Sequence, residues 1–515
     1  MITREYPPDT GFGGIATFSR HLAHGLKSLG HDVEVVSLTR ELASLDTKSD
    51  DQGVTVHRVA QEWLGERLGT ISFCMPYSRY TLMTSSSLWR KFLQLHMQKP
   101  FDVVDTPELL AEGFFPALTR ALPLVIRLYT PHSKFIAEKL HNVKQSFDHE
   151  FVAAIERIAM LSADVLTSPS NDLASFVAND LNYDLESIEI VRNPIDPSQF
   201  NPEGEQLLAP NGNLRVLFVG RLEERKGIHY LIDAIPLVKE KFDNVEFVII
   251  GDDTTNAEGQ KSVLTQLKKR IQRDGTGAWI KFINRVPLAD LPGYYRSADI
   301  CIVPSVYDNS PYTCLEAMSC GRPVIGTTGG GTAEYLKDEQ SGIIVPPRDH
   351  LAIAEALINL LGDEEKRKVM GASARQRVLA HFDRKEIARQ TAELYVLAQE
   401  RFAKRNNAAL YKKPAPDMLN DAVFMMRAFD QMIYDTLYQN SWRFRIRHWL
   451  RIIHKRPRLF VATGGLKLTH LLNRATANRL SAVRKLEAWL SQETALRSAD
   501  TPLIELLRPF SINAD

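Results

Sequence analysis

The chain has 515 residues, of which 44% are hydrophobic and 24% are charged, and its formal net charge is +1. One hydrophobic core rarely grows beyond about 300 residues, so we expect two core-forming domains and a smaller part, and the ordinary composition excludes a fibrous or largely disordered protein. We find neither an N-terminal apolar run of signal-peptide length nor roughly 20 consecutive apolar residues for a membrane-spanning helix, and we therefore expect a cytoplasmic protein.

Short runs rich in Val, Ile and Leu alternate with longer amphipathic stretches, as in parallel sheets whose strands are joined by helices. The first series of predicted strands is 33–37, 54–59, 102–105, 124–128, 165–168 and 188–191. The second series is 215–220, 245–251, 279–283, 300–304, 323–326 and 343–345. The predicted fold is α/β, with two doubly wound, Rossmann-like domains that face each other across a cleft lined by the carboxyl ends of strands.

A proline- and asparagine-rich segment, residues 193–213, separates the two series and reads as a linker. We place the domain boundary there. The predicted parts are an N-terminal domain at 1–195, a second domain at 196–403 and a basic, mainly helical extension at 404–515.

The N-terminal segment raises two questions. A strand should precede the loop at residues 6–8, yet only residues 1–4 are available. Strands usually need about 5 residues, so we expect a short first strand or a start upstream of Met1. Residues 11–16, GFGGIA, then open a helical pattern whose first amides suit a phosphate or a polar acceptor, with a plain tight turn as an equal alternative. The preceding prolines and the lack of an acidic residue closing strand 33–37 argue against an NAD site.

A basic loop follows the first strand of the second series. Residues 219–227, VGRLEERKG, leave this strand and enter a predicted helix. Arg221 and Lys226 are permanent cations beside glycine backbone, as is needed where a bond to a diphosphate breaks. A solvated basic loop is the alternative interpretation.

Residues 308–318, DNSPYTCLEAM, contain the most informative motif. Ser310 is predicted as the N-cap of a helix and Pro311 as its first residue, so that free amides face the cleft and favour anions. Glu316 lies about a turn and a half further along, at a spacing that can face Asp308 or a ligand hydroxyl. A surface carboxylate is the alternative for Glu316.

In their order and spacing these segments resemble the retaining GT-B glycosyltransferases of family 4. The resemblance extends over about residues 1–403. It is carried by YPP at 6–8, VRNPID at 191–196, GR at 220–221, KG at 226–227, EAMSCGRPVI at 316–325 and SG at 341–342.

The resemblance implies that residues 1–195 form the acceptor-side domain and residues 196–403 the nucleotide-sugar-binding domain. It also implies the roles of the donor-binding residues. Arg221 and Lys226 would hold the donor diphosphate, Glu316 the ribose hydroxyls, and Gly14 would lie near the diphosphate from the opposite domain. The backbone amides that would reach the sugar and the phosphates are those of Ser310, Pro311, Tyr312 and Thr313.

Two further residues are expected at the catalytic centre. Asp308 stands where the family's paired-glutamate motif has its first glutamate, which contacts the donor sugar. Because aspartate is one methylene shorter, that contact must be rebuilt and the identity of the sugar is open. His132 follows a strand end where family members often carry a histidine near the sugar, although a lone histidine is as often structural.

The implied activity is transfer of a hexosyl-type sugar from a nucleotide diphosphate donor to a glycan or lipid-linked acceptor, with retained configuration, in synthesis of a cell-surface polysaccharide or glycolipid. No cofactor and no metal are expected, because Arg and Lys replace the cation at the leaving phosphate. A non-catalytic nucleotide-sugar-binding protein, an epimerase and a phosphorylase are the alternatives.

The four cysteines, Cys74, Cys301, Cys314 and Cys320, show neither a CxxC pair nor a histidine at metal-ligand spacing. This pattern predicts no zinc site and no disulfide framework. We interpret the four residues as reduced core thiols.

The extension at 404–515 carries 19 Lys and Arg against 9 Asp and Glu. Within it, residues 441–486 contain 12 Lys and Arg and no acidic residue, interleaved with large apolar side chains. This composition predicts peripheral contact with an anionic membrane surface, and a helical appendage packed on the enzyme is an equal alternative. Nucleic acid is a poorer choice because no binding motif accompanies the charge.

Overall fold

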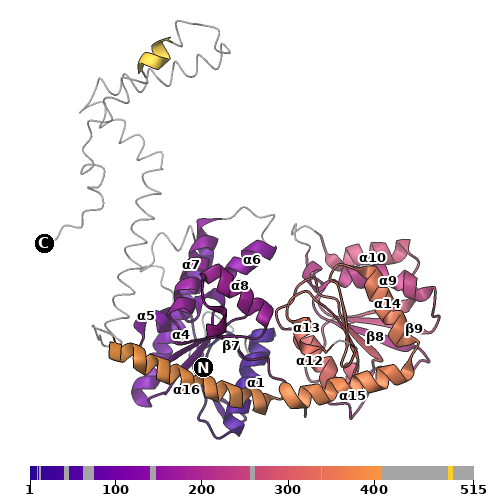
Figure 1. Cartoon of the computed structure of the whole chain (residues 1–515), viewed down its shortest axis with the longest axis horizontal. Helices are drawn as coiled ribbons and strands as arrows, with labels where there is room; N and C mark the ends of the chain where they lie inside the picture. Colours follow the sequence, from indigo (N-terminus) through magenta and orange to yellow (C-terminus); the bar gives the residue numbers. More distant parts are fainter. Residues whose placement is uncertain are drawn as a thin grey trace, which may run out of the picture. The chain divides into compact units, whose positions relative to one another are not determined.

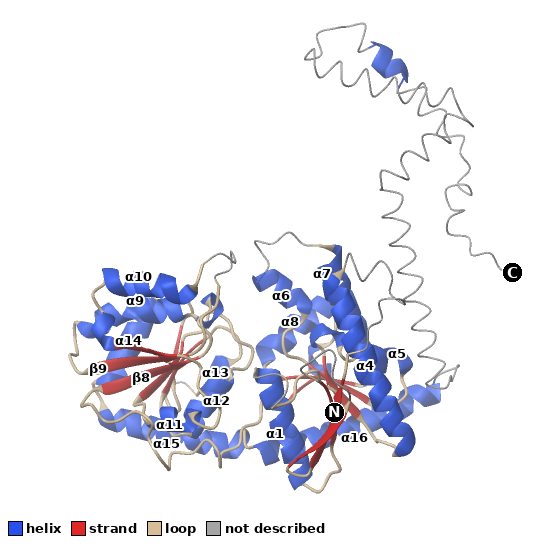
Figure 2. Cartoon of the chain, turned by 180° about the vertical axis from the view of Figure 1, so that it is seen from behind, coloured by secondary structure: helices blue, strands red, loops and turns tan. Residues whose placement is uncertain are grey.

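The computed structural model describes residues 1–8, 10, 13–39, 46–61, 75–139, 146–255, 261–337, 339–408 and 485–490. The chain divides into two compact units, Met1–Met426 and Arg427–Asp515. In the first unit, helices cover parallel sheets in two successive halves (Figures 1 and 2). Residues 409–484 and 491–515 of the predicted extension, including all of the basic segment 441–486 except its last two residues, lie outside the described residues.

The N-terminal half contains two small sheets. The first has the order β1-β3-β2, with β1 and β3 parallel and β2 antiparallel to β3; the second has the order β4-β5-β6-β7 and is parallel throughout. The bounds are β1 Glu34–Leu38, β2 Thr47–Asp51, β3 Val54–Val59, β4 Val104–Pro107, β5 Leu124–Arg127, β6 Val165–Ser168 and β7 Ile188–Ile190. The six predicted strands are confirmed, whereas β2 was not predicted because its sequence, TKSDD, is polar and mostly exposed.

A short extended segment at the start of the chain joins these two sheets. The amide of Ile2 donates a hydrogen bond to the carbonyl of Asp105 at 2.9 Å, and the amide of Thr3 donates one to the carbonyl of Val36 at 3.0 Å. Ile2 thus lies between β1 and β4, where it forms a parallel bridge with Val36. A first strand this short matches the expectation for residues 1–4.

The C-terminal half contains one parallel sheet with the order β10-β9-β8-β11-β12-β13. Its strands are β8 Leu214–Val219, β9 Val245–Ile250, β10 Ile280–Ile283, β11 Ile300–Val303, β12 Val324–Thr327 and β13 Ile343–Val345. All six strands were predicted. Because β8 and β11 are neighbours, the strand order changes direction between them, and a ligand site is expected beyond their carboxyl ends.

Helices cover these sheets and fill the crossovers between parallel strands. In the N-terminal half they are α1 Gly14–Ser28, α4 Pro76–Gln98, α5 Phe114–Thr119, α6 His132–Lys139, α7 Phe147–Ser162 and α8 Asn171–Leu181. The remaining helices are α9 Ile228–Lys239, α10 Val263–Arg273, α11 Leu291–Arg296, α12 Tyr312–Ser319, α13 Thr332–Tyr335, α14 His350–Leu361, α15 Glu364–His381 and α16 Arg384–Ala408. None of the described helices is long and apolar enough to cross a membrane.

Helix α16 returns the chain from the C-terminal half to the N-terminal half, and Figure 1 shows α15 and α16 in succession along the two halves. Ile387, Leu394 and Ala398 of α16 are buried in one cluster with side chains of β5 and β6. At its first residue α16 lies so close to α1 that a Cβ atom on Gly25 would stand 2.5 Å from the carbonyl oxygen of Arg384.

The contact at Gly25 gives a first prediction. Replacing Gly25 with Ala puts a methyl group against backbone that cannot yield as a flexible side chain would, and we expect the free energy of unfolding to fall by about 1–3 kcal/mol. Gly277→Ala is the matched control, because its new methyl would meet Ile271 at an ordinary 3.7 Å. Urea denaturation of both variants measures the difference, and equal stability of the two would show that α1 and α16 do not pack this closely.

Candidate functional site

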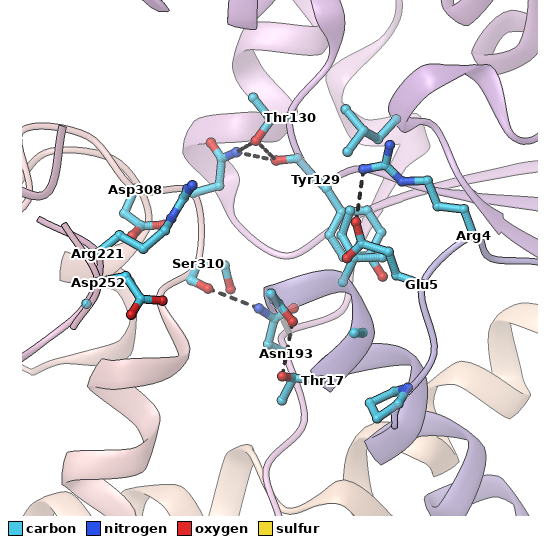
Figure 3. A pocket seen from close by; sticks show the side chains of 18 of the residues that line it. Arg4, Glu5, Thr17, Tyr129, Thr130, Asn193, Arg221, Asp252, Asp308 and Ser310 are labelled. Atoms are coloured by element: carbon cyan, nitrogen blue, oxygen red, sulfur yellow. Dashed lines mark hydrogen bonds and ion pairs between the residues drawn. The ribbon is translucent and has the colours of Figure 1, made fainter. Parts of the chain in front are cut away.

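A cleft of about 1820 Å³ lies between the two halves. From the N-terminal half it is lined by residues at the start of α1 and after β4 and β5, and from the C-terminal half by residues after β8, β9 and β11. Figure 3 shows Arg4, Glu5, Tyr129 and Thr130 on one side and Arg221, Asp252, Asp308 and Ser310 on the other.

Two glycines shape the wall formed by the C-terminal half. A Cβ atom on Gly251, after β9, would stand 1.9 Å from the carbonyl oxygen of Gly220, after β8. Gly227 has φ +68°, and its Cβ would stand 1.8 Å from the carbonyl oxygen of Pro304. Only glycine permits these approaches, which bring the loop 220–227 against the end of β11.

The cations of the loop 220–227 occupy two positions. Arg221 lines the cleft with a side chain that is 59% exposed, and its guanidinium lies 3.3 Å from Glu223. Lys226 lies behind the cleft wall, with Nζ 2.5 Å from Oδ2 of Asp308. Arg225 also lines the cleft and was not predicted as a site residue, although it is the third basic residue of the same loop.

Asp308 is buried and lines the cleft at the end of the β11 loop. Burial would raise the pKa of its carboxyl, but Lys226 and Arg225 outweigh burial, and the net effect is a pKa below the usual value. The Arg225 guanidinium lies 3.7 Å from the carboxylate. Asp308 is therefore an anion held by two cations of the loop that was predicted to bind a diphosphate.

The start of α12 differs from the prediction for Ser310 and Pro311. The first helical residue is Tyr312, and Pro311 is the N-cap residue with an extended backbone, φ −72° and ψ 119°. Ser310 therefore lies too early to cap the helix, and its hydroxyl is instead hydrogen-bonded to the hydroxyl of Tyr335. Its carbonyl accepts a hydrogen bond from Asn193 at 3.1 Å and is fixed at the cleft.

Tyr312 connects the two halves. Its side chain is 8% exposed and lies in the hydrophobic cluster of Phe18 and Leu22 in the N-terminal half. A Cβ atom on Gly14 would stand 3.7 Å from this ring, so Gly14 of α1, which lines the cleft, is brought together with Tyr312 of the opposite half. The Tyr312 hydroxyl is buried and has no hydrogen-bond partner among the described residues. Thr313, which follows Tyr312, is partly buried.

Glu316 is 5% exposed, so the alternative of a surface carboxylate is wrong. Its Oε2 accepts a hydrogen bond from the hydroxyl of Tyr295 at 2.7 Å. Burial raises the pKa of Glu316 to about 7, against the opposing effects of Tyr295 and Lys226. Its partner Tyr295 was not predicted, because nothing in the local sequence links α11 with α12.

His132 is the first residue of α6 and lines the cleft, although it is only 3% exposed. Its Nε2 lies 3.0 Å from Nδ1 of His149 on α7, and its backbone amide donates to Glu156 at 2.6 Å. Burial and the neighbouring His149 lower the pKa of His132 to about 4. The ring is therefore neutral near pH 7, so one ring of the pair donates a hydrogen bond and the other accepts it.

Three buried glutamates support the N-terminal wall and were missed by sequence reasoning. Burial raises the pKa of Glu108 and of Glu112 to about 8, and that of Glu156 also lies well above its usual range. Glu108 accepts a hydrogen bond from the backbone amide of Tyr129 at 2.7 Å, and Glu156 accepts one from the backbone amide of Leu110 at 2.7 Å. The sequence feature that could have revealed two of them is the pair Glu108 and Glu112, which stands in an apolar stretch directly after a strand.

Polar contacts also join the halves on either side of the cleft. The side-chain amide of Asn309 donates to the carbonyl of Tyr129 and, at 2.7 Å, to the hydroxyl of Thr130 (Figure 3). Glu334 of α13 lies 2.6 Å from Arg192 and accepts from the amide of Asn171 at the start of α8 at 2.9 Å. Residues 307–310 are thereby held from both sides.

Among the described residues, no group of three or more His, Cys, Asp or Glu side chains is arranged to hold a metal ion. Cys301, Cys314 and Cys320 are buried and form no disulfide, while Cys74 lies outside the described residues. Gly11, in the predicted phosphate-binding segment 11–16, lies outside them as well.

Two family profiles match the chain over most of its first 377 residues. The profile described as Glycosyltransferase Family 4 matches residues 12–199, and the profile described as Glycosyl transferases group 1 matches residues 200–377. An uncharacterized glycosyltransferase of Methanocaldococcus jannaschii is 27% identical over 78% of this chain and 98% of its own length. The glycogen synthase of Mycobacterium tuberculosis is 26% identical over 78% of this chain and 94% of its own length.

Solved structures share the fold with its two α/β halves. The sucrose-phosphate synthase of Thermosynechococcus elongatus superimposes with a TM-score of 0.63 at 21% identity, over 77% of this chain and 98% of that one. The Anabaena protein HepE in complex with UDP-glucose gives a TM-score of 0.55 at 18% identity, over 77% of this chain and 99% of that one. At these identities the likeness concerns the fold.

The buried hydroxyl of Tyr312 gives a second prediction. A buried hydroxyl without a partner costs roughly 1–3 kcal/mol, so Tyr312→Phe should raise the free energy of unfolding by about 1 kcal/mol. Tyr395→Phe is the control in the opposite direction, because the Tyr395 hydroxyl donates to Asp105 at 2.6 Å and its loss should destabilise the chain. Melting temperatures of both variants measure this, and a less stable Tyr312→Phe variant would mean that the hydroxyl has a partner.

The raised pKa of Glu316 gives a third prediction. Between the ordinary value of 4.5 and a folded value of about 7, the folded chain keeps a proton that the unfolded chain has lost. The contribution of Glu316 to the free energy of unfolding therefore falls as pH rises through this window and stays constant above it. Glu316→Gln cannot ionise, so its melting temperature relative to wild type should increase from about pH 5 to about pH 7 and then stay constant. A difference independent of pH would contradict the assignment, and Glu240→Gln at an exposed position is the control substitution.

Proposed function

The chain belongs to the group 1 glycosyl transferases of family 4, a GT-B family that moves a sugar from a nucleotide sugar, and on this premise we propose a retaining, metal-independent hexosyltransferase. We propose that its product belongs to a cell-surface polysaccharide or glycolipid. The observation that carries the proposal is the pair of arginines, Arg221 and Arg225, which line the cleft beside the carboxyl end of β8.

Arginine suits the leaving diphosphate for physical reasons. Its guanidinium stays charged at every relevant pH and presents a planar set of donors to phosphate oxygens. Arg221 reaches the cleft from glycine backbone, next to the start of α9, whose amides also favour an anion. Charge supplied in this way stabilises a departing diphosphate without a bound metal ion.

In the proposed reaction the bond between the anomeric carbon of the donor sugar and the diphosphate oxygen breaks, and the electron pair leaves with the diphosphate. The acceptor hydroxyl attacks from the same face and gives its proton to the departing phosphate oxygen. No protein base is needed, and the neutral His132 fits a hydrogen-bonding contact with the sugar better than a proton transfer at neutral pH.

Asp308 has a double role in this proposal. Its contact of 2.5 Å with Lys226 holds the lysine ammonium in place. When the donor binds, the Lys226 ammonium would donate hydrogen bonds to both Asp308 and the diphosphate. Asp308 would also accept a hydrogen bond from a hydroxyl of the donor sugar. We propose that Glu316, with a pKa of about 7, accepts the ribose hydroxyls once it is ionised.

The relatives support a hexose donor. The protein HepE has been solved with UDP-glucose, and the mycobacterial relative is named a glycogen synthase. We propose a nucleoside diphosphate hexose for this chain on that basis. Contact of residues 441–486 with an anionic membrane remains a prediction, because residues 441–484 lie outside the described part of the chain.

The fourth prediction tests donor binding. UDP, GDP, ADP and their sugar conjugates are screened by thermal shift, since a ligand that binds only the folded chain raises its melting temperature. We expect a shift with one nucleotide series and its loss in Arg221→Ala, because the exposed guanidinium faces the diphosphate. Arg273→Ala is the matched control, since Arg273 is an exposed arginine paired with Asp274 outside the cleft.

Turnover is then followed as release of the nucleoside diphosphate from the selected donor. Lys226→Met should reduce this release about 100-fold or more, the usual cost of losing one charge-stabilising group. A shift without any turnover in wild type would favour a non-catalytic nucleotide-sugar-binding protein. The absence of a shift with every nucleotide would contradict the proposed function.

A further inference from the structure

We propose that the acceptor end of the substrate is a neutral sugar ring, held on a wall formed by Glu5, Arg4, Tyr80 and Tyr77, which we call the acceptor wall. This inference rests on the proposed function, because it names the class of acceptor used at the same cleft. The wall belongs to the N-terminal half and faces the loops that we assign to the donor.

The aromatic part of the acceptor wall comes from α4. Tyr77 and Tyr80 are three residues apart, so both side chains lie on one face of the helix, and both line the cleft. Tyr77 is 50% exposed and Tyr80 is 39% exposed, which is unusual for large rings in a cleft that has buried tyrosines elsewhere. Such rings offer a flat apolar surface with a polar edge to a ligand.

The ring of Tyr77 is held in place from behind. Its centroid lies 4.4 Å from that of His149 and 6.4 Å from that of His132. Its backbone amide donates to the carboxylate of Asp148 at 2.9 Å. A ligand that covers the exposed face of Tyr77 therefore meets a surface that is already positioned, next to the histidine that we expect near the donor sugar.

The polar part of the acceptor wall continues from Tyr80. Tyr80 interacts electrostatically with the guanidinium of Arg4, which lies 3.1 Å from Oε1 of Glu5. The other oxygen of Glu5 faces the start of α1, where a Cβ atom on Gly13 would stand 3.9 Å away. Glu5 thus offers a hydrogen-bond acceptor between the aromatic rings and the α1 terminus, and Figure 3 shows its side chain at the cleft.

The charges of this wall favour a neutral ligand. Arg4 is paired with Glu5, and the other arginine that lines this side, Arg20, is bound to Asp51 through two nitrogens at 3.0 and 3.2 Å. A phosphate would have to displace a carboxylate from either arginine and would approach the Glu5 anion. A hydroxyl faces no such repulsion, and it donates to a carboxylate in a strong, charge-assisted hydrogen bond.

A sugar ring combines the two features that the wall requires. One face of a hexopyranose consists mainly of C–H groups that pack on an aromatic ring, and its rim consists of hydroxyls that donate to a carboxylate. The Tyr77 ring would cover the apolar face and Glu5 would orient a rim hydroxyl. A lipid phosphate at this position would leave the carboxylate of Glu5 opposed to another anion.

The test compares neutral and phosphorylated acceptors with the nucleotide sugar chosen by thermal shift. Octyl glucoside, octyl galactoside and octyl mannoside are added in one series, and the corresponding hexose phosphates in the other, while release of the nucleoside diphosphate is followed. We expect at least one neutral glycoside to stimulate release and the phosphates to have no such effect.

The variants separate the wall from the rest of the cleft. The measured quantity is kcat/KM for the glycoside. Tyr77→Ala should lower it roughly tenfold, whereas Tyr77→Phe keeps the ring and should stay within about twofold of wild type. Glu5→Gln should lower the same quantity roughly tenfold or more, as expected for a hydrogen bond to a charged group. Phe147→Ala is the matched control, because Phe147 is 60% exposed and does not line the cleft.

The outcomes distinguish the inference from the proposed function. Three results would overturn the inference and leave donor binding intact. The first is stimulation by hexose phosphates alone. The second is that no neutral glycoside stimulates release although the nucleotide still shifts the melting temperature, and the third is equal stimulation in wild type and Tyr77→Ala. Loss of the thermal shift in a variant would mark it as misfolded, and Glu5→Gln then carries the comparison with wild type. Absence of any nucleotide shift in wild type would overturn both.

Discussion

The ring of Tyr312 extends from the donor side into the hydrophobic cluster of the N-terminal half, where it packs over Gly14, and the cleft depends on this contact. It fixes the first residue of α12 relative to the first residue of α1. The neighbouring residue Asn309 adds hydrogen bonds to Tyr129 and Thr130 in the same half. The loop that precedes α12 is therefore positioned by both halves, and a small displacement of one half would change the groups that face a donor.

Charge inside the cleft is distributed according to burial. The exposed Arg221 is available to a ligand, whereas the less exposed Lys226 is held by an internal carboxylate that keeps its own charge. Glu316 and Glu108 have no comparable cation at contact distance in the described part of the chain, and burial raises their pKa values to about 7 and about 8. A carboxyl side chain in this protein is thus an anion (Asp308), a titrating group (Glu316) or a neutral hydrogen-bonding group (Glu108), depending on its neighbours.

The sequence predicted the sheets well because parallel strands are buried on both faces and produce apolar runs that stand out locally. It also placed Arg221 and Asp308 at the cleft, since the ends of parallel strands meet at one edge of a sheet. It failed at β2, whose polar residues pair only because β3 lies beside them, and at Ser310, because the extended backbone of Pro311 delays the start of α12.

By itself, the sequence determined the α/β fold, the order of the strands along the chain and the loops that carry the cations, because these depend on local periodicity, glycine and proline. Only the tertiary structure decided that α16 returns to the N-terminal half, that Tyr295 holds Glu316, and that Arg4 and Glu5 form one wall with the tyrosines of α4. These contacts join residues far apart in the chain, and their geometry is set by packing, on which local sequence patterns carry no information.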